Sequence, residues 1–230
     1  MGGQMATFVL IPGAHGRAWY WHRLIPELER RGHQAVAAEL PVTDPSAGFD
    51  EYVQAVVTAI GDRRGDLVLV AQSLAGLIAP LVTRRVPARL MVLLNAMVPR
   101  PGETAGQWWE STGHQAEADP SDPVRAFFHD VPPEVTEEAM AAGEQRVRFD
   151  ALFSQPWPLA AWPKVETRFL QGRDDRFLPL EFQRRVVKGR LGMEIDEMPG
   201  GHLVALSRPG ELADRLVAYA ESPPSSTGGG

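Results

Sequence analysis

The sequence of 230 residues contains no cysteine. This absence excludes disulfide bonds, metal sites built from thiolates and catalysis by a cysteine nucleophile. It is compatible with the reducing interior of a cell, and we expect a cytoplasmic protein. No spacing of histidine and carboxylate residues resembles a metal site, and no glycine motif for a dinucleotide or a phosphate is present. The sequence therefore predicts no bound metal and no other cofactor.

The chain also lacks long apolar runs and blocks of basic residues. No apolar stretch approaches the roughly 20 residues that a membrane-spanning helix needs, and the first residues do not resemble a signal peptide. The formal net charge of −6 argues against binding to the phosphates of a nucleic acid. We therefore expect no membrane or nucleic-acid partner, and either a monomer or a homodimer. The polar residues 223–230 are predicted to form a disordered tail.

Short apolar runs alternate with amphipathic segments along most of the chain. Val53, Val56 and Ile60, for example, recur at the spacing of one helix face, which predicts a helix over 50–63. Such alternation indicates βαβ units, and hence an α/β fold with a mostly parallel sheet flanked by helices. The predicted strands are 8–11, 35–38, 67–70, 90–94, 167–171 and 193–198, and the other predicted helices are 19–31, 77–82, 180–188 and 209–221.

Residues 99–163 differ in character from the segments on either side. They contain no convincing strand, several prolines and four of the six tryptophans. We interpret them as a helical lid inserted into a core formed by residues 1–98 and 164–222. Trp108 and Trp157 are predicted to line an apolar substrate pocket beneath this lid. The alternative is that these rings only pack the insertion onto the core.

One serine stands where a buried strand is expected to meet a helix. Ser73 follows the apolar run 67–70 and is flanked two positions away by Ala71 and Ala75, with Gly76 directly behind. A nucleophile on a tight strand-to-helix turn needs small residues at these positions, because neighbouring backbone lies close to them. The usual pattern has glycine at both positions. A serine that only caps a helix is the alternative interpretation.

Three functional side chains are expected at the carboxyl ends of predicted strands, which is the ligand-binding edge of an open α/β sheet. They are Ser73, Asp175 and His202. A histidine can take the proton of a serine hydroxyl, and a carboxylate can orient that histidine. The reaction also needs N–H donors for the oxyanion, and we predict the backbone N–H groups of Ala14 and Leu74.

Taken together, these motifs resemble the alpha/beta-hydrolase family over residues 6–221. The segment 12–16 is similar to the family's oxyanion loop, with Pro12 in place of the usual histidine. The segment 172–179 is similar to its acid turn, which implies Asp175 rather than Asp174 as the acid. Gly201 and His202 resemble its histidine loop. Some members carry the acid after the strand that precedes the lid, but here that strand ends in Asn95.

The segments 19–21 and 98–103 resemble most closely the branch that contains plant methyl esterases and hydroxynitrile lyases. The resemblance implies a serine hydrolase that cleaves a small ester with an apolar or aromatic part. His15 and Gln72 are further candidates for substrate contact, although His15 could equally be a loop residue without such a role. A lyase is one alternative, but related lyases place a lysine directly after the histidine, where this chain has Leu203. A ligand receptor without turnover is the other alternative.

Overall fold

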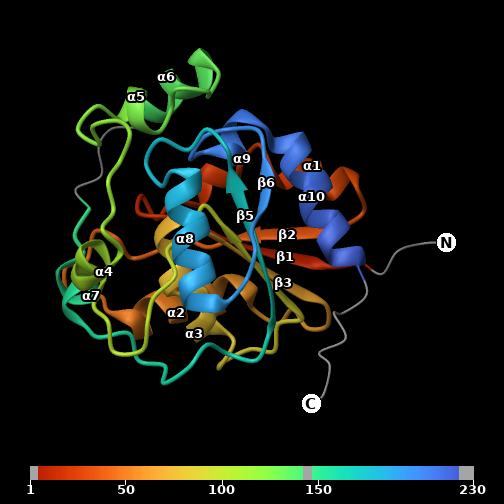
Figure 1. Cartoon of the computed structure of the whole chain (residues 1–230). Helices are drawn as coiled ribbons and strands as arrows, with labels where there is room; N and C mark the ends of the chain where they lie inside the picture. Colours follow the sequence, from red (N-terminus) through yellow and green to blue (C-terminus); the bar gives the residue numbers. More distant parts are fainter. Residues whose placement is uncertain (1–4, 142–146, 223–230) are drawn as a thin grey trace.

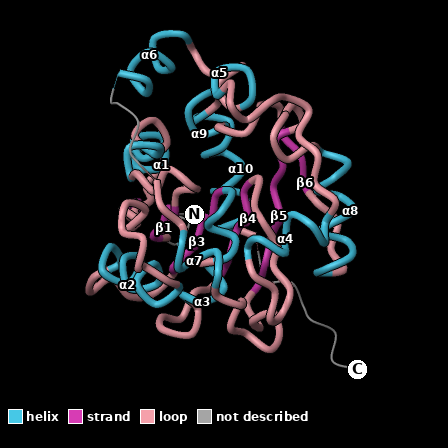
Figure 2. Tube along the Cα trace, turned by 90° about the vertical axis from the view of Figure 1, so that its left-hand side faces the viewer, coloured by secondary structure: helices cyan, strands magenta, loops and turns pink. Residues whose placement is uncertain are grey.

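The computed structural model describes residues 5–141 and 147–222, and the predicted tail at 223–230 lies outside them. Six parallel strands form one sheet in the order β2-β1-β3-β4-β5-β6 (Figures 1 and 2). This arrangement confirms the predicted α/β fold. The strands are β1 (Thr7–Ile11), β2 (Gln34–Ala37), β3 (Leu67–Gln72), β4 (Leu90–Leu94), β5 (Glu166–Gly172) and β6 (Asp196–Met198).

The central strands are buried on both faces, and their side chains divide between two cores with a period of two. In β3, Leu67 and Leu69 face one core, whereas Val68 and Val70 face the other. The first core is covered by α2 (Phe49–Ile60), α3 (Ala79–Val82) and α8 (Leu180–Leu191), and the second by α1 (Ile25–Arg30), α9 (Val204–Ser207) and α10 (Pro209–Glu221). The sheet is therefore flanked by helices on both sides, as predicted.

The helix predicted over 19–31 is wrong as a single element. The structure has a short 3-10 helix, η1 (Ala18–Trp21), followed by α1, which begins at Ile25 with Pro26 in its first turn. Proline has no N–H and its ring clashes with the preceding turn, so a helix tolerates it only near its start. The helix predicted over 77–82 is likewise divided into η2 (Ser73–Leu77) and α3, and Pro80 lies in the first turn of α3.

Between β4 and β5 the described residues contain four helices and no strand. These are α4 (Ala105–Thr112), α5 (Pro123–Ala126), α6 (Pro133–Ala141) and α7 (Asp150–Ser154). Both views place α5 and α6 at the end of the molecule opposite to α2 and α3 (Figures 1 and 2). Among the described residues, no helix is long and apolar enough to cross a lipid bilayer.

The strand order determines where a ligand site can form. From β1 the chain passes outward to the edge strand β2 and then returns to β3 on the other side of β1. In open α/β sheets, ligands bind at the carboxyl ends of the strands where such a reversal occurs, which here are β1 and β3. The segment 12–16 follows β1 and Ser73 follows β3, so two of the predicted functional segments lie at this place.

Candidate active site

Ser73 lies on a sharp turn directly after β3. Its φ of +54° is in the left-handed region, which is uncommon outside glycine. Helix η2 begins at Ser73, and Gln72 occupies the N-cap position, so Ser73 does not serve as a helix cap. A Cβ on Gly76 would lie 1.9 Å from the carbonyl oxygen of Met97, whose N–H donates to the Ser73 carbonyl. Close contact with the segment after β4 thus demands glycine at position 76, whereas Ala71 and Ala75 are accommodated in the core.

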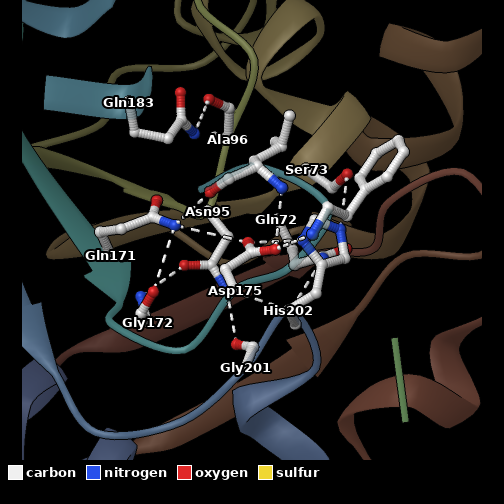
Figure 3. Close-up of polar contacts among 12 residues, drawn as sticks. Gln72, Ser73, Asn95, Ala96, Gln171, Gly172, Asp175, Gln183, Gly201 and His202 are labelled. Carbon is white, nitrogen blue, oxygen red and sulfur yellow. Dashed lines mark hydrogen bonds and ion pairs between the residues drawn. The ribbon is translucent and has the colours of Figure 1, made fainter. Parts of the chain in front are cut away.

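The three predicted side chains come together in one hydrogen-bonded chain (Figure 3). His202 Nε2 lies 3.1 Å from Ser73 Oγ, and His202 Nδ1 lies 2.7 Å from Asp175 Oδ2. None of the three residues is more than 7% exposed. A carboxylate only accepts hydrogen bonds, so it holds the imidazole proton on Nδ1 and leaves Nε2 as the acceptor for the serine hydroxyl. This arrangement can transfer a proton from Ser73 to His202.

The carboxylate of Asp175 is fixed by the turn that carries it. Its Oδ1 accepts the N–H groups of Phe177 and Leu178, each at 2.9 Å, and its Oδ2 also lies 3.4 Å from Gln171 Nε2. These donors fix the orientation of the carboxylate and aim the second oxygen at His202. Asp174 has a different role, because its Oδ2 accepts the N–H of Gly200 at 3.1 Å. The structure thus directs Asp175, and not Asp174, at the histidine.

The loop that carries His202 lies between β6 and α9, and besides the acid turn it is bonded to three other segments. The N–H of Gly201 donates to Asp130 Oδ2 at 2.8 Å, which links the loop to the insertion between β4 and β5. The amides of Gln72 and Asn95 both donate to the carbonyl oxygen of His202. The backbone next to the imidazole is thereby held from more than one side.

The segment after β1 packs directly against the serine. A Cβ on Gly13 would lie 2.9 Å from Ser73 Cβ and 2.2 Å from Gln72 Oε1, so only glycine fits there. The next residue, Ala14, is exposed, whereas Leu74 is buried beneath the turn. The two predicted oxyanion donors therefore belong to segments that meet at Ser73. His15 is also exposed, and its predicted substrate contact stays a prediction.

Two phenylalanines contact His202, whereas the two tryptophans predicted to line a substrate pocket are buried. The rings of Phe127 and Phe177 have centroids 5.6 Å and 5.3 Å from that of His202. Trp108 and Trp157 are 0% and 2% exposed, and their indole N–H groups donate to the backbone carbonyls at positions 98 and 77. Neither indole offers surface to a substrate in this conformation, so we correct that prediction: these two rings pack the insertion onto the core.

Burial also affects a tyrosine near the site. Burial and, to a smaller extent, the charges of Asp175 and Asp130 raise the pKa of Tyr20 well above its usual value. This phenol therefore stays neutral, and it is not suited to act as a base. Within the described part of the chain, no group of three or more His, Asp and Glu side chains could hold a metal ion.

Several residues of the site were not identified from sequence. Gln171 could have been noticed as a polar residue at the end of an apolar strand. Phe127 and Asp130 carry no such signal, because they lie in an irregular segment between two short helices. Their proximity to His202 arises only from the way in which the insertion folds back over the carboxyl edge of the sheet.

The chain is similar in sequence and in fold to known proteins. The alpha/beta hydrolase family matches residues 8–215. An alpha-hydroxynitrile lyase of Arabidopsis thaliana is 25% identical, with 93% of this chain and 96% of the relative covered. A pyrethroid hydrolase of Sphingobium wenxiniae is 23% identical, with 95% and 89% covered. The crystal structure of polyneuridine aldehyde esterase has a TM-score of 0.78 at 20% identity, covering 94% of this chain and all of that one. These matches confirm the resemblance predicted from the motifs.

Proposed function

Because the chain belongs to the alpha/beta hydrolase family, and because Ser73, His202 and Asp175 form one hydrogen-bonded chain, we propose that it is a serine hydrolase. In this proposal it cleaves a small carboxylic ester with an apolar or aromatic part. The observation that carries the proposal is the serine on its left-handed turn, with its hydroxyl 3.1 Å from the imidazole.

In the proposed reaction, Ser73 Oγ attacks the ester carbonyl while His202 Nε2 takes its proton. The Asp175 carboxylate stabilises the resulting imidazolium through Nδ1. The carbonyl oxygen becomes an oxyanion bound by the N–H groups of Ala14 and Leu74, and loss of one such donor typically costs about 3 kcal/mol of barrier. His202 then protonates the leaving alkoxide, and an alcohol departs. Water, activated by the same histidine, hydrolyses the acyl-serine and releases the acid.

Support for an apolar or aromatic substrate part comes from the surroundings of His202. Phe127 and Phe177 are both half-buried and pack against the imidazole ring. Aromatic walls at this place favour apolar groups and exclude strongly polar ones. One relative in sequence, the pyrethroid hydrolase, is named as a hydrolase. One neighbour in structure, polyneuridine aldehyde esterase, is named as an esterase.

The insertion at 99–163 is proposed to act as the lid of this site. It supplies Phe127 to the imidazole and Asp130 to the loop that carries it. A movement of the insertion would therefore change both the walls of the site and the support of its base.

A lyase reaction at the same three residues is the second candidate function. The observation that favours it is the similarity to the alpha-hydroxynitrile lyase across 93% of this chain. Against it, the side chain after His202 is the apolar Leu203, which supplies no positive charge for a cyanide leaving group. Release of cyanide from an aromatic cyanohydrin, measured beside hydrolysis of the matching acetate ester, distinguishes the two reactions.

The test of the hydrolase proposal is covalent labelling with a fluorophosphonate, followed by intact-mass measurement. The expected result is one adduct per chain in the native protein and none in Ser73→Ala, with steady-state turnover of aryl esters by the native protein only. A folded native protein that shows neither labelling nor turnover would contradict the proposal. It would favour a receptor that binds ligand without turnover.

A further inference from the structure

Two side-chain amides converge on a single backbone oxygen next to the proposed base. Asn95 Nδ2 donates to the carbonyl of His202 at 3.1 Å, and Gln72 Nε2 donates to the same carbonyl at 3.3 Å (Figure 3). Asn95 is 0% exposed and Gln72 is 3% exposed. A carbonyl oxygen has two acceptor sites, so both are occupied by side chains at the ends of two neighbouring strands, β3 and β4.

Each of the two amide side chains belongs to a residue at the carboxyl end of a central strand, close to the site. Gln72 directly precedes Ser73 and also packs against Gly13, whose missing side chain leaves room for it. Asn95 directly follows β4 and has a φ of +46°, a conformation that asparagine tolerates better than most residues other than glycine. The backbone is thus adapted at Asn95 itself, and at Gly13 beside Gln72.

Asn95 also joins the histidine loop to the strand that leads into the acid turn. Its Nδ2 donates to the carbonyl of Gly201 at 3.0 Å as well, and its Oδ1 accepts the N–H of Gly172 at 2.7 Å. Gly172 ends β5, three residues before Asp175. One side chain therefore bonds both the segment that leads to the acid and the segment that carries the base.

We propose that Gln72 and Asn95 are positioning residues. Their hydrogen bonds to the His202 carbonyl hold the imidazole of His202 in line between Ser73 and Asp175. This inference rests on the proposed function. An amide is suited to the role because it stays neutral at every pH at which the protein is folded, so it adds no second titrating group beside the base. A small misplacement of a reacting group can cost on the order of a hundredfold in rate.

The test uses two variants and one matched control. Gln72→Met removes the amide at nearly constant size. Asn95→Asp keeps an acceptor for Gly172 but places a carboxylate oxygen opposite the carbonyls of Gly201 and His202. The control is Gln183→Met, because Gln183 is also fully buried and donates to a backbone carbonyl, that of Ala96, at 2.9 Å. It removes the same group without touching the histidine loop.

Two measurements separate positioning from folding. The first is the second-order rate of fluorophosphonate labelling at Ser73, and we expect it to fall at least about tenfold in both variants and less than about twofold in the control. The second is the NMR signal of the hydrogen-bonded Nδ1 proton of His202. We expect it in the native protein and in the control, and we expect it broadened or lost in the two variants.

The NMR measurement does not depend on turnover, so the two proposals can fail separately. A native protein with the Nδ1 signal but without labelling would contradict the hydrolase function, and the comparison of that signal among variants would still decide the positioning role. The positioning role is overturned if both variants keep the native Nδ1 signal. It is also overturned if the labelling rates of Gln72→Met and Asn95→Asp fall no further than that of Gln183→Met when the variants have lost the same thermal stability.

Discussion

His202 Nδ1 lies 2.7 Å from Asp175 Oδ2, and the other oxygen of the same carboxylate accepts two backbone N–H groups from its own turn. The carboxylate thus has one oxygen for the turn and one for the histidine. This division matters because the first oxygen fixes the direction in which the second one points. Because each oxygen of Asp175 has its own partners, a substitution that removes the charge but keeps the shape of the side chain separates support of the turn from orientation of the histidine.

Asp175→Asn should keep the turn and lose the catalysis. The amide oxygen can still accept the N–H groups of Phe177 and Leu178, but the NH2 group then faces His202 and favours the wrong tautomer. We expect kcat for an aryl ester to fall about ten-thousandfold, as in other triads altered in this way. Circular dichroism and a melting curve should show a folded protein.

Asp174→Asn is the matched control for that experiment. Its side chain accepts the N–H of Gly200 through Oδ2 and is not bonded to His202. An amide oxygen can replace this acceptor, so we expect kcat within about threefold of the native value. Equal losses in the two variants would contradict the assignment of Asp175 as the acid.

Gly13→Ala should disrupt the segment that is proposed to supply an oxyanion donor. The new methyl group would lie 2.2 Å from Gln72 Oε1 and 2.9 Å from Ser73 Cβ, so the loop or the turn must move. We expect kcat to fall about a hundredfold or more, the effect of a displaced oxyanion donor, with a loss of about 1–3 kcal/mol in the free energy of unfolding.

Gly189→Ala is the control for Gly13→Ala, because a Cβ at Gly189 in α8 meets no atom within 4 Å. It should raise helix stability by about 0.5–1 kcal/mol and leave kcat unchanged. Native kcat in Gly13→Ala would show that the segment after β1 takes no part in the reaction.

Phe127→Leu should change which esters are preferred. The ring of Phe127 packs on His202, and its loss removes aromatic surface beside the proposed base. We expect kcat/KM for an aryl ester to fall about five- to thirtyfold, equivalent to about 1–2 kcal/mol, with little change for a short alkyl ester. The control is Phe153→Leu, since Phe153 stacks on Phe149 within the same insertion at 4.9 Å. If Phe127→Leu and Phe153→Leu show the same ratio of kcat/KM for the aryl ester to that for the alkyl ester, Phe127 does not determine the substrate preference.

The sheet and the three central residues could be predicted from sequence because their signals are local. Buried parallel strands are short apolar runs, and Ser73 directly follows one, whereas Asp175 and His202 lie three and four residues after the ends of β5 and β6. Parallel strands then bring their carboxyl ends to one edge without further information. The division of the first helix could also have been predicted, because Pro26 is visible in the sequence and excludes a helix interior.

The walls of the site could not be predicted in the same way. An aromatic ring has the same appearance in a sequence whether it packs a core or lines a pocket, and only burial distinguishes Trp108 from Phe127. The contacts of Phe127 and Asp130 with the histidine loop join residues more than seventy positions apart. Phe127 and Asp130 lie in a segment without helical or strand periodicity. The local sequence therefore indicates neither the partner of each side chain nor the direction in which it points.

The last prediction concerns the ion pair that ties the insertion to the core. Glu103, just before α4, pairs with Arg190 of α8, and their side chains are only 8% and 3% exposed. Burial alone raises the pKa of the Glu103 carboxyl, but hydrogen bonds from Arg190, Ser111 and the N–H of Arg100 outweigh it, and the pKa is lowered below the usual 4.5. Glu103→Gln leaves Arg190 buried without a counter-charge and should cost about 3 kcal/mol at pH 7.

The lowered pKa of Glu103 determines how the difference in free energy of unfolding between the native protein and Glu103→Gln changes with pH. A carboxyl whose pKa is lower in the folded state stabilises the fold above its unfolded pKa, and this contribution is lost as the pH falls through the folded pKa. The free energy of unfolding of the native protein should therefore approach that of Glu103→Gln as the pH falls below about 4.5, as measured by urea unfolding between pH 7 and pH 3. Glu181→Gln is the control, because its carboxylate is 79% exposed and should contribute less than about 0.5 kcal/mol at any pH. Parallel curves for the native protein and Glu103→Gln would show that Glu103 is not stabilised in its charged form.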